Sequence, residues 1–414
     1  MQVRIYSGMA LTSAAMLTGL NMIAADVCAN TSDRFELSGF ARLVGGYLDS
    51  HQQTVEGYEN SFALDQQSLL ALQPTWHLSD QLALTAQLLA HSSDSRRSGV
   101  EWLYLSWQPE PAWQFRAGKL RTPFFSFSDS LDVGYSYPWI TPPVQLYNSL
   151  LFPTFKGANA SYTWSGPDLA VQLEGLYGYY KGDVVMAGSR IDAQTEVSNM
   201  TGFNLNLSRN NLRLRLSWNS GDNHTEIARL QPLQDALQQT GMDDSYNSLQ
   251  ADGKIQVYGA GLSYEDVSSF YRAEWVKIDT EMDLAPQLTS WYASAGQLFG
   301  RWSGHLTFAR SSYSSATPAD ELAAFRDDPA SPLYPLAAGY YQAYANIPRG
   351  GLDSYTLGLR WDFRLNMALK AELTELREHN PHSGFFSPAV AMDDSSSNVK
   401  QRATLYQIGW EWVF

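Results

Sequence analysis

From Arg34 onward, polar and apolar residues alternate with a period of two in segments of about ten residues. The clearest segment carries large apolar side chains on one face, at Tyr406, Ile408, Trp410, Trp412 and Phe414. The other face of the same segment carries Gln407, Gly409, Glu411 and Val413. An aromatic face of this kind needs an apolar cover, and lipid would supply it. The pattern is therefore typical of a membrane β-barrel, whose strands turn one face to hydrocarbon and the other to water.

This period predicts sixteen strands, at 34–48, 61–75, 81–91, 100–107, 112–120, 155–164, 168–180, 200–208, 211–219, 254–264, 269–279, 289–298, 301–312, 352–363, 366–377 and 401–414. After the first strand, long connections alternate with short turns rich in Gly, Pro, Asn and Asp. Short turns at one end and long loops at the other are the layout of an outer-membrane barrel, with both chain ends expected in the periplasm. Two loop stretches, 226–239 and 320–327, are predicted to form short helices.

Other protein classes fit the sequence less well. A soluble β-sandwich also alternates, but its dry core would leave the successive inward charges of Arg213 and Arg215 unpaired. A helical membrane protein is excluded because no apolar stretch approaching the ~20 residues of a spanning helix follows position 25. The 13% aromatic content excludes a disordered chain. The net charge of −14 argues against nucleic acid as a partner, because phosphate binding needs a basic face.

The first 29 residues are interpreted as a secretory signal peptide, with Arg4 in the charged region and Val27-Cys28-Ala29 at the cleavage site. A cut after Ala25 and a short N-terminal helix are the alternatives. The remaining chain, 30–414, is expected to form a single barrel domain. Cys28 is the only cysteine, so the mature chain is predicted to contain no disulfide.

The sixteen strands, the long connection after the fifth strand and the C-terminal phenylalanine together resemble the Gram-negative porin superfamily. That resemblance covers the whole mature chain and implies an all-β, antiparallel transmembrane barrel in the outer membrane. The same resemblance implies a homotrimer that needs no cofactor. It also implies that the third long loop, Arg121 to Thr154, folds into the lumen. By the same resemblance, Phe414 with Tyr406, Ile408, Trp410 and Trp412 forms the recognition signal for the barrel-assembly machinery. The Pro-Glu-Phe-Gly-Gly run of classical enterobacterial constriction loops is absent, so no selectivity is carried over from that family.

A pore selects by the charges at its narrowest point. Inward parity places five arginines on the strands, namely Arg42, Arg116, Arg213, Arg215 and Arg360. The third loop contributes Asp129 and Asp132, with Arg121 at its root. An arginine wall facing loop carboxylates would create a transverse field across the constriction. The alternative is that the arginines only solvate a wide lumen. Tyr135, Tyr137 and Trp139 would either stack against sugar rings or fasten the loop to the wall.

These features predict passive diffusion of small hydrophilic solutes and ions through a water-filled channel. A substrate-specific channel for anions or sugars, and a plugged structural or adhesive barrel, remain as alternatives. Catalysis is not expected, because the two close His–Ser pairs, His91-Ser92-Ser93 and His382-Ser383, are generic and no Gly-x-Ser-x-Gly elbow exists. No metal site is expected in the barrel. Acidic loop pairs would either be solvated or bind divalent cations that bridge to lipopolysaccharide, at Asp243-Asp244, Asp320-Glu321, Asp327-Asp328 and Asp393-Asp394.

Overall fold

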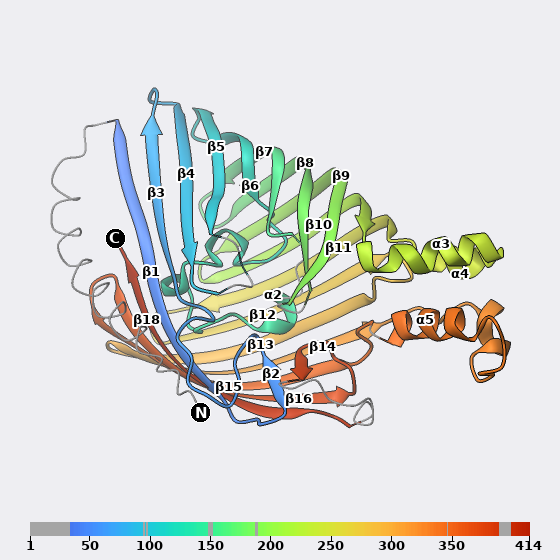
Figure 1. Cartoon of the computed structure of the whole chain (residues 1–414). Coiled ribbons are helices and arrows are strands. Elements are labelled where there is room, and N and C mark those ends of the chain that lie inside the picture. Colours follow the sequence, from blue (N-terminus) through green and yellow to red (C-terminus); the bar gives the residue numbers. More distant parts are fainter. Residues whose placement is uncertain are drawn as a thin grey trace, which may run out of the picture.

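The computed structural model describes residues 34–93, 96, 98–147, 152–186, 189–345, 347–388 and 399–414. Within these residues, sixteen antiparallel strands close into one barrel, in which each strand pairs with its neighbours in the sequence (Figure 1). The sixteen-stranded antiparallel barrel predicted from the alternation is therefore confirmed. The proposed signal peptide and the Asp393-Asp394 pair lie outside the described residues.

The barrel strands agree closely with the predicted ones. They are β1 (Phe35–Leu48), β3 (Leu69–His77), β4 (Leu82–His91), β5 (Gly99–Glu110), β6 (Trp113–Arg121), β7 (Thr154–Ser165), β8 (Ala170–Met186), β9 (Ser189–Arg209), β10 (Leu212–Glu226), β11 (Asp252–Glu265), β12 (Ser269–Thr280), β13 (Gln287–Phe299), β14 (Trp302–Ser314), β15 (Gly351–Arg364), β16 (Met367–Asn380) and β18 (Arg402–Val413).

Successive side chains along a strand face opposite sides of the barrel wall, as the period of two requires. On β14, Leu306 is 65% exposed on the outer surface, whereas its neighbours His305 and Thr307 are 4% and 6% exposed. Aromatic rings gather on the outer surface near the short-turn end, where Trp302 and Trp361 stack with centroids 5.1 Å apart. An apolar outer band edged by aromatic rings is the arrangement that a bilayer requires of a barrel.

The barrel closes between β1 and β18, which pair from Phe40 opposite Val413 to Leu48 opposite Leu405. Gly39 and Phe414 extend this seam with two backbone hydrogen bonds of 2.9 and 3.0 Å. A Cβ on Gly39 would lie 2.5 Å from the Phe414 ring, so only glycine lets this ring lie against the first strand. The other residues of the predicted assembly signal also face outward, with Tyr406 45% and Ile408 54% exposed.

Four strand predictions need correction, including that of β10, which ends at Glu226 and not at 219. β3 begins at Leu69 and not at 61, because between 61 and 68 only Ala63 forms a bridge with β1, through Gly46. β8 and β9 run well past the predicted ends at 180 and 200 and form a long hairpin. In this extension Ala193, Thr195 and Val197 are buried whereas Gln194 and Glu196 are exposed, so the exposed positions are polar and lack the apolar signal of a spanning strand. A small sheet of β2 (Gln53–Val55) and β17 (Phe386–Pro388) was not predicted.

Helices in two long loops form an arm that projects from the long-loop end of the barrel (Figure 1). The arm consists of η3 (Ala228–Leu230), α3 (Gln231–Thr240), α4 (Asp243–Ser248), η4 (Asp320–Phe325) and α5 (Tyr334–Ala345). The helices predicted at 226–239 and 320–327 correspond to α3 and η4, whereas α4 and α5 were missed. In α5, Ala337, Tyr340 and Tyr344 share a helical face and are buried against Leu237, Leu249 and Leu322. None of the helices in the described part of the chain is both long and apolar enough to cross a membrane.

Candidate functional site

The connection between β6 and β7, which the structure describes at residues 122–147 and 152–153, runs inside the barrel, and we call it the inner loop (Figure 1). It contains η1 (Ser128–Ser130), η2 (Gly134–Ser136) and α2 (Val144–Tyr147). Trp139 at its centre is 1% exposed, and its indole Nε1 donates to Thr307 Oγ1 on the inner face of β14 at 2.8 Å. The loop therefore narrows the lumen, and the groups that hold it in place determine the shape of any channel.

Three cations of the barrel wall, Arg42, Arg360 and Lys370, hold residues 134–140 of the inner loop, and we call them the loop clamp. Lys370 is fully buried, and its Nζ donates to the carbonyl oxygens of Gly134 at 2.6 Å, Tyr137 at 2.9 Å and Trp139 at 2.5 Å. Arg360 donates to the carbonyl oxygens of Tyr135 at 2.8 Å and Tyr137 at 3.1 Å. Hydrogen bonds from a charged donor are about twice as strong as neutral ones, so the backbone of this segment is fixed from the wall side.

Carboxylates of the wall complete the clamp. Arg42 donates to the carbonyl oxygen of Ile140, and its Nε lies 3.6 Å from Glu411 Oε1. Glu372 accepts a hydrogen bond of 2.8 Å from the Ile140 amide nitrogen. A Cβ on Gly134 would lie 2.1 Å from Glu411 Oε1, so a side chain at this position would displace the carboxylate. The buried charges therefore have partners, which is the condition for placing them inside a protein.

A second group of charges holds the inner loop where it leaves β6, and we call Arg96, Glu101, Arg121 and Asp132 the root cluster. The Asp132 carboxylate, 4% exposed, pairs with the guanidinium groups of both Arg96 and Arg121. Glu101 accepts from the same two arginines at 2.9 Å each. Burial alone would raise the pKa of Asp132, but the two adjacent guanidinium groups hold it well below its usual range. Asp132 is therefore ionised and neutralised by its partners at neutral pH.

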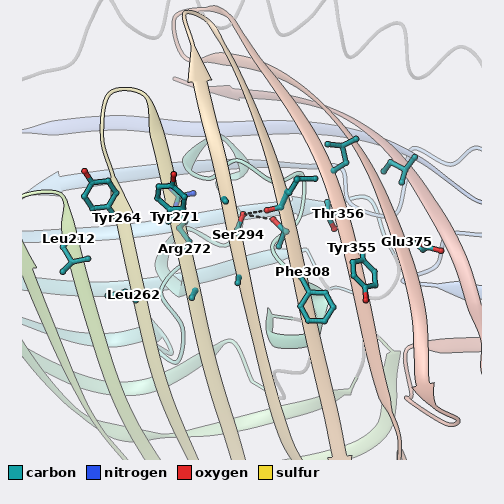
Figure 2. A pocket seen from close by; sticks show the side chains of 17 residues that line it. Leu212, Leu262, Tyr264, Tyr271, Arg272, Ser294, Phe308, Tyr355, Thr356 and Glu375 are labelled. Carbon is teal, nitrogen blue, oxygen red and sulfur yellow. Dashed lines mark hydrogen bonds between the residues drawn. The ribbon is translucent and has the colours of Figure 1, made fainter.

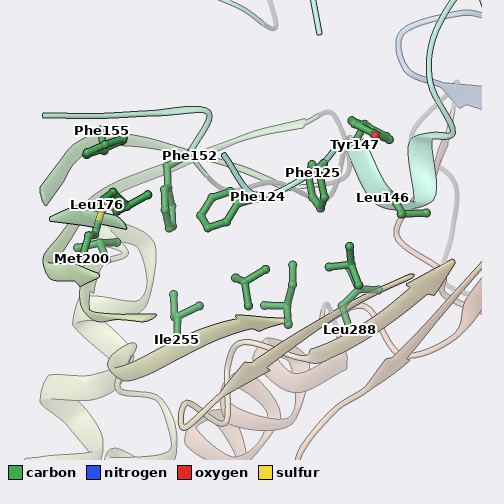
Figure 3. Close-up of a cluster of buried hydrophobic side chains, with 14 of the residues drawn as sticks. Phe124, Phe125, Leu146, Tyr147, Phe152, Phe155, Leu176, Met200, Ile255 and Leu288 are labelled. Atoms are coloured by element: carbon green, nitrogen blue, oxygen red, sulfur yellow. The ribbon is translucent and has the colours of Figure 1, made fainter. Parts of the chain in front are cut away.

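A third attachment joins the inner loop to β12 through Glu274. This carboxylate is 4% exposed and accepts hydrogen bonds from the Tyr147 hydroxyl at 2.6 Å and the Ser126 amide nitrogen at 2.8 Å. Around it, apolar side chains of the inner loop pack against inward apolar side chains of the wall (Figure 3). The loop contributes Phe124, Phe125, Leu146, Tyr147 and Phe152, and the wall contributes, among others, Phe155, Leu176, Met200, Ile255 and Leu288. This part of the lumen is filled by side chains.

Charged side chains that remain open to water gather on the inner face of β6, β8 and β10. Arg116 has a side chain 24% exposed and lies 3.6 Å from Glu174. Arg215 donates to Asn206 Oδ1 at 3.2 Å, to Asn204 Oδ1 at 2.9 Å and to the carbonyl oxygen of Pro123 in the inner loop at 2.5 Å. Arg213, nearer the short turns, is exposed. Asp129 of the inner loop is also exposed, and its charge acts on Glu174. We call the ionisable residues of this group, Arg116, Glu174, Arg213, Arg215 and Asp129, the lumen charges.

Comparison with solved structures defines the fold. OmpT of Vibrio cholerae superimposes with a TM-score of 0.54 at 11% sequence identity, covering 93% of this chain and 99% of that one. The anion-selective porin from Comamonas acidovorans gives a TM-score of 0.55 at 11% identity, with coverage of 92% and 99%. The outer-membrane channel DcaP of Acinetobacter baumannii gives 0.53 at 9% identity, with coverage of 92% and 97%. The chain has the sixteen-stranded porin fold. Its sequence matches no protein-family model and no curated protein.

Within this porin fold, the residues predicted to form a constriction separate into two sets. Arg116, Arg213, Arg215 and Asp129 belong to the lumen charges, although Arg215 also binds the inner loop at the Pro123 carbonyl oxygen. Arg42, Arg121, Arg360 and Asp132 instead bind the inner loop or one another: Arg42 and Arg121 are 6% and 7% exposed, and the Arg360 side chain is 13% exposed and paired with Asp362. These four side chains therefore anchor the inner loop. The predicted arrangement, a continuous arginine wall facing two free carboxylates, is not present.

The aromatic residues of the inner loop also serve as anchors. Tyr137 and Trp139 are each 1% exposed, so they cannot stack against a solute, whereas Tyr135 is partly exposed and lies under the Arg360 guanidinium at 4.5 Å from its ring centroid. Sequence reasoning missed several carboxylates that complete the site, namely Glu101, Glu174 and Glu274. Inward parity on β8 and β12 was the available signal for Glu174 and Glu274. Among the described residues, no group of three or more His, Cys, Asp or Glu side chains could hold a metal ion.

Proposed function

We propose that the protein is a porin of the Gram-negative outer membrane, through which small hydrophilic solutes and ions diffuse down their gradients. The observation that carries this proposal is the arrangement of the inner loop, which three wall cations hold inside a barrel with an apolar outer surface. A loop that merely capped the barrel would not need buried charges to hold it against the inner wall. The protein then acts by permeation, without catalysis and without a cofactor.

The proposed constriction lies between Asp129 of the inner loop and the lumen charges on β6, β8 and β10. Arg116, Arg213 and Arg215 supply positive charge there, and Glu174 with Asp129 supplies negative charge. Opposite charges across a narrow, water-filled passage orient dipolar solutes and disfavour apolar ones. Because three cations face two anions, we expect a weak preference for anions over cations.

The test is single-channel recording after insertion into a planar bilayer. The proposal predicts stepwise, ohmic currents, and in a salt gradient a reversal potential on the anion-selective side. The matched pair Asp129→Asn and Arg213→Gln removes one charge of each sign from exposed positions. The first change should shift the reversal potential toward anions and the second toward cations. Equal reversal potentials in both variants would show that these side chains lie outside the conducting path.

A plugged barrel is the second candidate, and a specific observation favours it. Besides the cluster in Figure 3, a second apolar cluster fills the space between β1, β15, β16, β18 and the small sheet of β2 and β17, with Leu48, Val55, Tyr58, Leu352 and Phe385 among its buried members. A plugged barrel would insert into the bilayer and pass no current. A solute-specific channel, by contrast, would conduct and show saturable block when its anion or sugar is added.

The proposal extends to assembly. We infer that the outward aromatic residues of β18, ending at Phe414, are recognised by the barrel-assembly machinery, and that the barrel forms a homotrimer in a membrane containing lipopolysaccharide. The exposed position of this face supports recognition by another protein. Extraction in a mild detergent followed by mass measurement of the unheated particle tests the trimer, and a particle of one chain would contradict it.

A further inference from the structure

A row of charged side chains crosses the outer surface of the barrel, where apolar residues are the rule. In the strand register, Arg310 lies opposite Asp353, Asp353 opposite Arg377, and Arg377 opposite Arg402. The row therefore follows one level across β14, β15, β16 and β18. We call these four residues the outer charge row.

The side chains of the row project from the wall. Those of Arg310, Arg377 and Arg402 are 45%, 48% and 65% exposed. Like charges directly opposite each other on neighbouring strands destabilise a sheet, and Arg377 and Arg402 are such a pair. Both contact the single carboxylate of Glu375, while Asp353 pairs with Arg310 through two hydrogen bonds of 2.7 Å. Three arginines thus share two carboxylates, and the surplus positive charge lies at Arg377 and Arg402.

The height of the row matches the edge of the apolar band. Trp412 lies near the short-turn end of β18, and Arg402 lies ten positions from it along the same strand. At roughly 3.3 Å per residue and a strand tilt of roughly 45°, the two lie roughly 23 Å apart along the barrel axis, which is close to the ~25 Å height of an outer-membrane apolar band. The arginines are therefore at the level of lipid headgroups on the long-loop side.

An apolar groove of about 730 Å³ lies directly beside the row on the same outer surface (Figure 2). The small side chains of Ala273, Ala293 and Ala295 line the floor of the groove. Aromatic rings border it, among them Tyr271, Phe308 and Tyr355. The groove reaches Glu375, the carboxylate shared by Arg377 and Arg402. The guanidinium groups of Arg310 and Arg377 also lie 5.7 and 5.6 Å from the ring centroids of Phe308 and Tyr355. Charge row and groove are thus one continuous surface.

We propose that this surface binds a phosphorylated lipid of the outer leaflet, with a phosphate on Arg377 and Arg402 and an acyl chain in the groove. The proposal rests on the membrane location given under the proposed function. Charge complementarity selects the ligand: the chain as a whole has a net charge of −14, yet this row carries excess positive charge at headgroup level. Guanidinium groups suit phosphate because they can donate two parallel hydrogen bonds. A groove with alanines on its floor can hold a flexible alkyl chain. A bulky aromatic side chain substituted for one of these alanines would displace that alkyl chain.

The test measures retention of diphosphoryl lipid A by the whole folded barrel in detergent, by native mass spectrometry. The charge variant is Arg377→Gln/Arg402→Gln, and the groove variant is Ala293→Phe. Lys277→Gln is the matched control, because it removes an outer-surface cation of β12, paired with Asp279, away from the row. Fully dephosphorylated lipid A and acyl-free glucosamine 1-phosphate are the comparison ligands. Folding of every variant is checked by heat-modifiable migration, and its channel by bilayer recording.

The charge variant is expected to retain lipid A about 30-fold less tightly (about 2 kcal/mol, at roughly 1 kcal/mol per arginine near a membrane surface), with the control unchanged. The groove variant should also lose lipid A although it keeps every charge. Equal retention by wild type and charge variant would overturn the site, and so would tight binding of glucosamine 1-phosphate, which would indicate a soluble phosphate. A change of particle mass in the charge variant would instead make the row a subunit contact. A wild-type barrel that retains lipid A but passes no current would refute the channel and leave the lipid site standing.

Discussion

Replacing Lys370 by methionine tests whether the loop clamp holds the inner loop. Methionine has a similar length and no charge, so it fills the same buried space without donating hydrogen bonds. In the native protein the Lys370 Nζ donates to three loop carbonyl oxygens, at 2.5 to 2.9 Å, and lies 4.0 Å from Glu411. The change therefore removes three charge-assisted bonds and one cation near the Glu411 carboxylate in a single step.

The size of the effect follows from these contacts. Hydrogen bonds to charged groups contribute roughly 1.5–3 kcal/mol each, and breaking a buried charge pair costs roughly 3–5 kcal/mol in total. Arg360 still holds the Tyr137 carbonyl oxygen, so the cost of breaking a buried charge pair is the better guide, at about 4 kcal/mol. At 1.4 kcal/mol per tenfold, the fraction of molecules with a released loop should rise roughly a thousandfold. The sheet register itself contains none of these bonds, so the barrel should still form.

Single-channel recording measures the outcome directly. Lys370→Met should insert normally, show the heat-modifiable migration of a folded barrel, and give larger or rapidly fluctuating currents. Lys181→Met is the control, because Lys181 has a side chain 64% exposed on the long hairpin and the variant loses the same charge outside the lumen. Conductance and current noise identical to wild type in Lys370→Met would refute the clamp, and a matching change in the control would assign the effect to net charge.

Three further predictions address the lumen, the root cluster and the seam. Asp129→Asn should shift the reversal potential in a salt gradient toward anions, without changing heat stability. Asp132→Asn should lower the stability of the loop attachment by about 3–5 kcal/mol, seen as a lower midpoint of heat-modifiable migration, with no direct effect on selectivity. Because the folded-state pKa of Asp132 lies below its ordinary value of 3.8, the wild-type attachment should persist above that pH and weaken only as the pH falls through the depressed pKa. Phe414→Ala should slow barrel assembly in vesicles supplied with the assembly machinery, whereas Phe363→Ala, an aromatic change on β15, should not.

The spanning strands could be predicted from the sequence because one physical cause, lipid outside and water inside, acts on every residue between the turns. Leu357 and Leu359 alternate with Thr356 and Arg360 for this reason, and β15 lies where that alternation predicts it. The period-two alternation of outward apolar and inward polar residues is absent from segments that do not lie between lipid and water. β8 and β9 continue as a hairpin whose exposed positions, such as Gln194 and Glu196, are polar, and α5 follows a helical rather than a period-two pattern.

The candidate site was harder to predict, because parity gives the side of the wall on which a residue lies but not the partner that it meets. Asp129 and Asp132 are three positions apart in the same loop and look equivalent in the sequence. The turn at η1 leaves Asp129 exposed and returns Asp132 to Arg121, so only one of them keeps a free charge. Likewise, Arg42, Arg213 and Arg360 all face inward, but the path of the inner loop determines that two of them become anchors.

The helical arm places a constraint on attempts to re-engineer the cell-surface side of this protein. Leu237 and Leu249 in one loop share a buried cluster with Leu322, Tyr340 and Tyr344 in another, and the Ser248 and Tyr340 hydroxyls lie 2.8 Å apart. Shortening either loop alone would expose the apolar side chains of the other loop to water and promote aggregation. A display scaffold or a vaccine antigen built on this barrel would have to keep the two loops together or replace both at once.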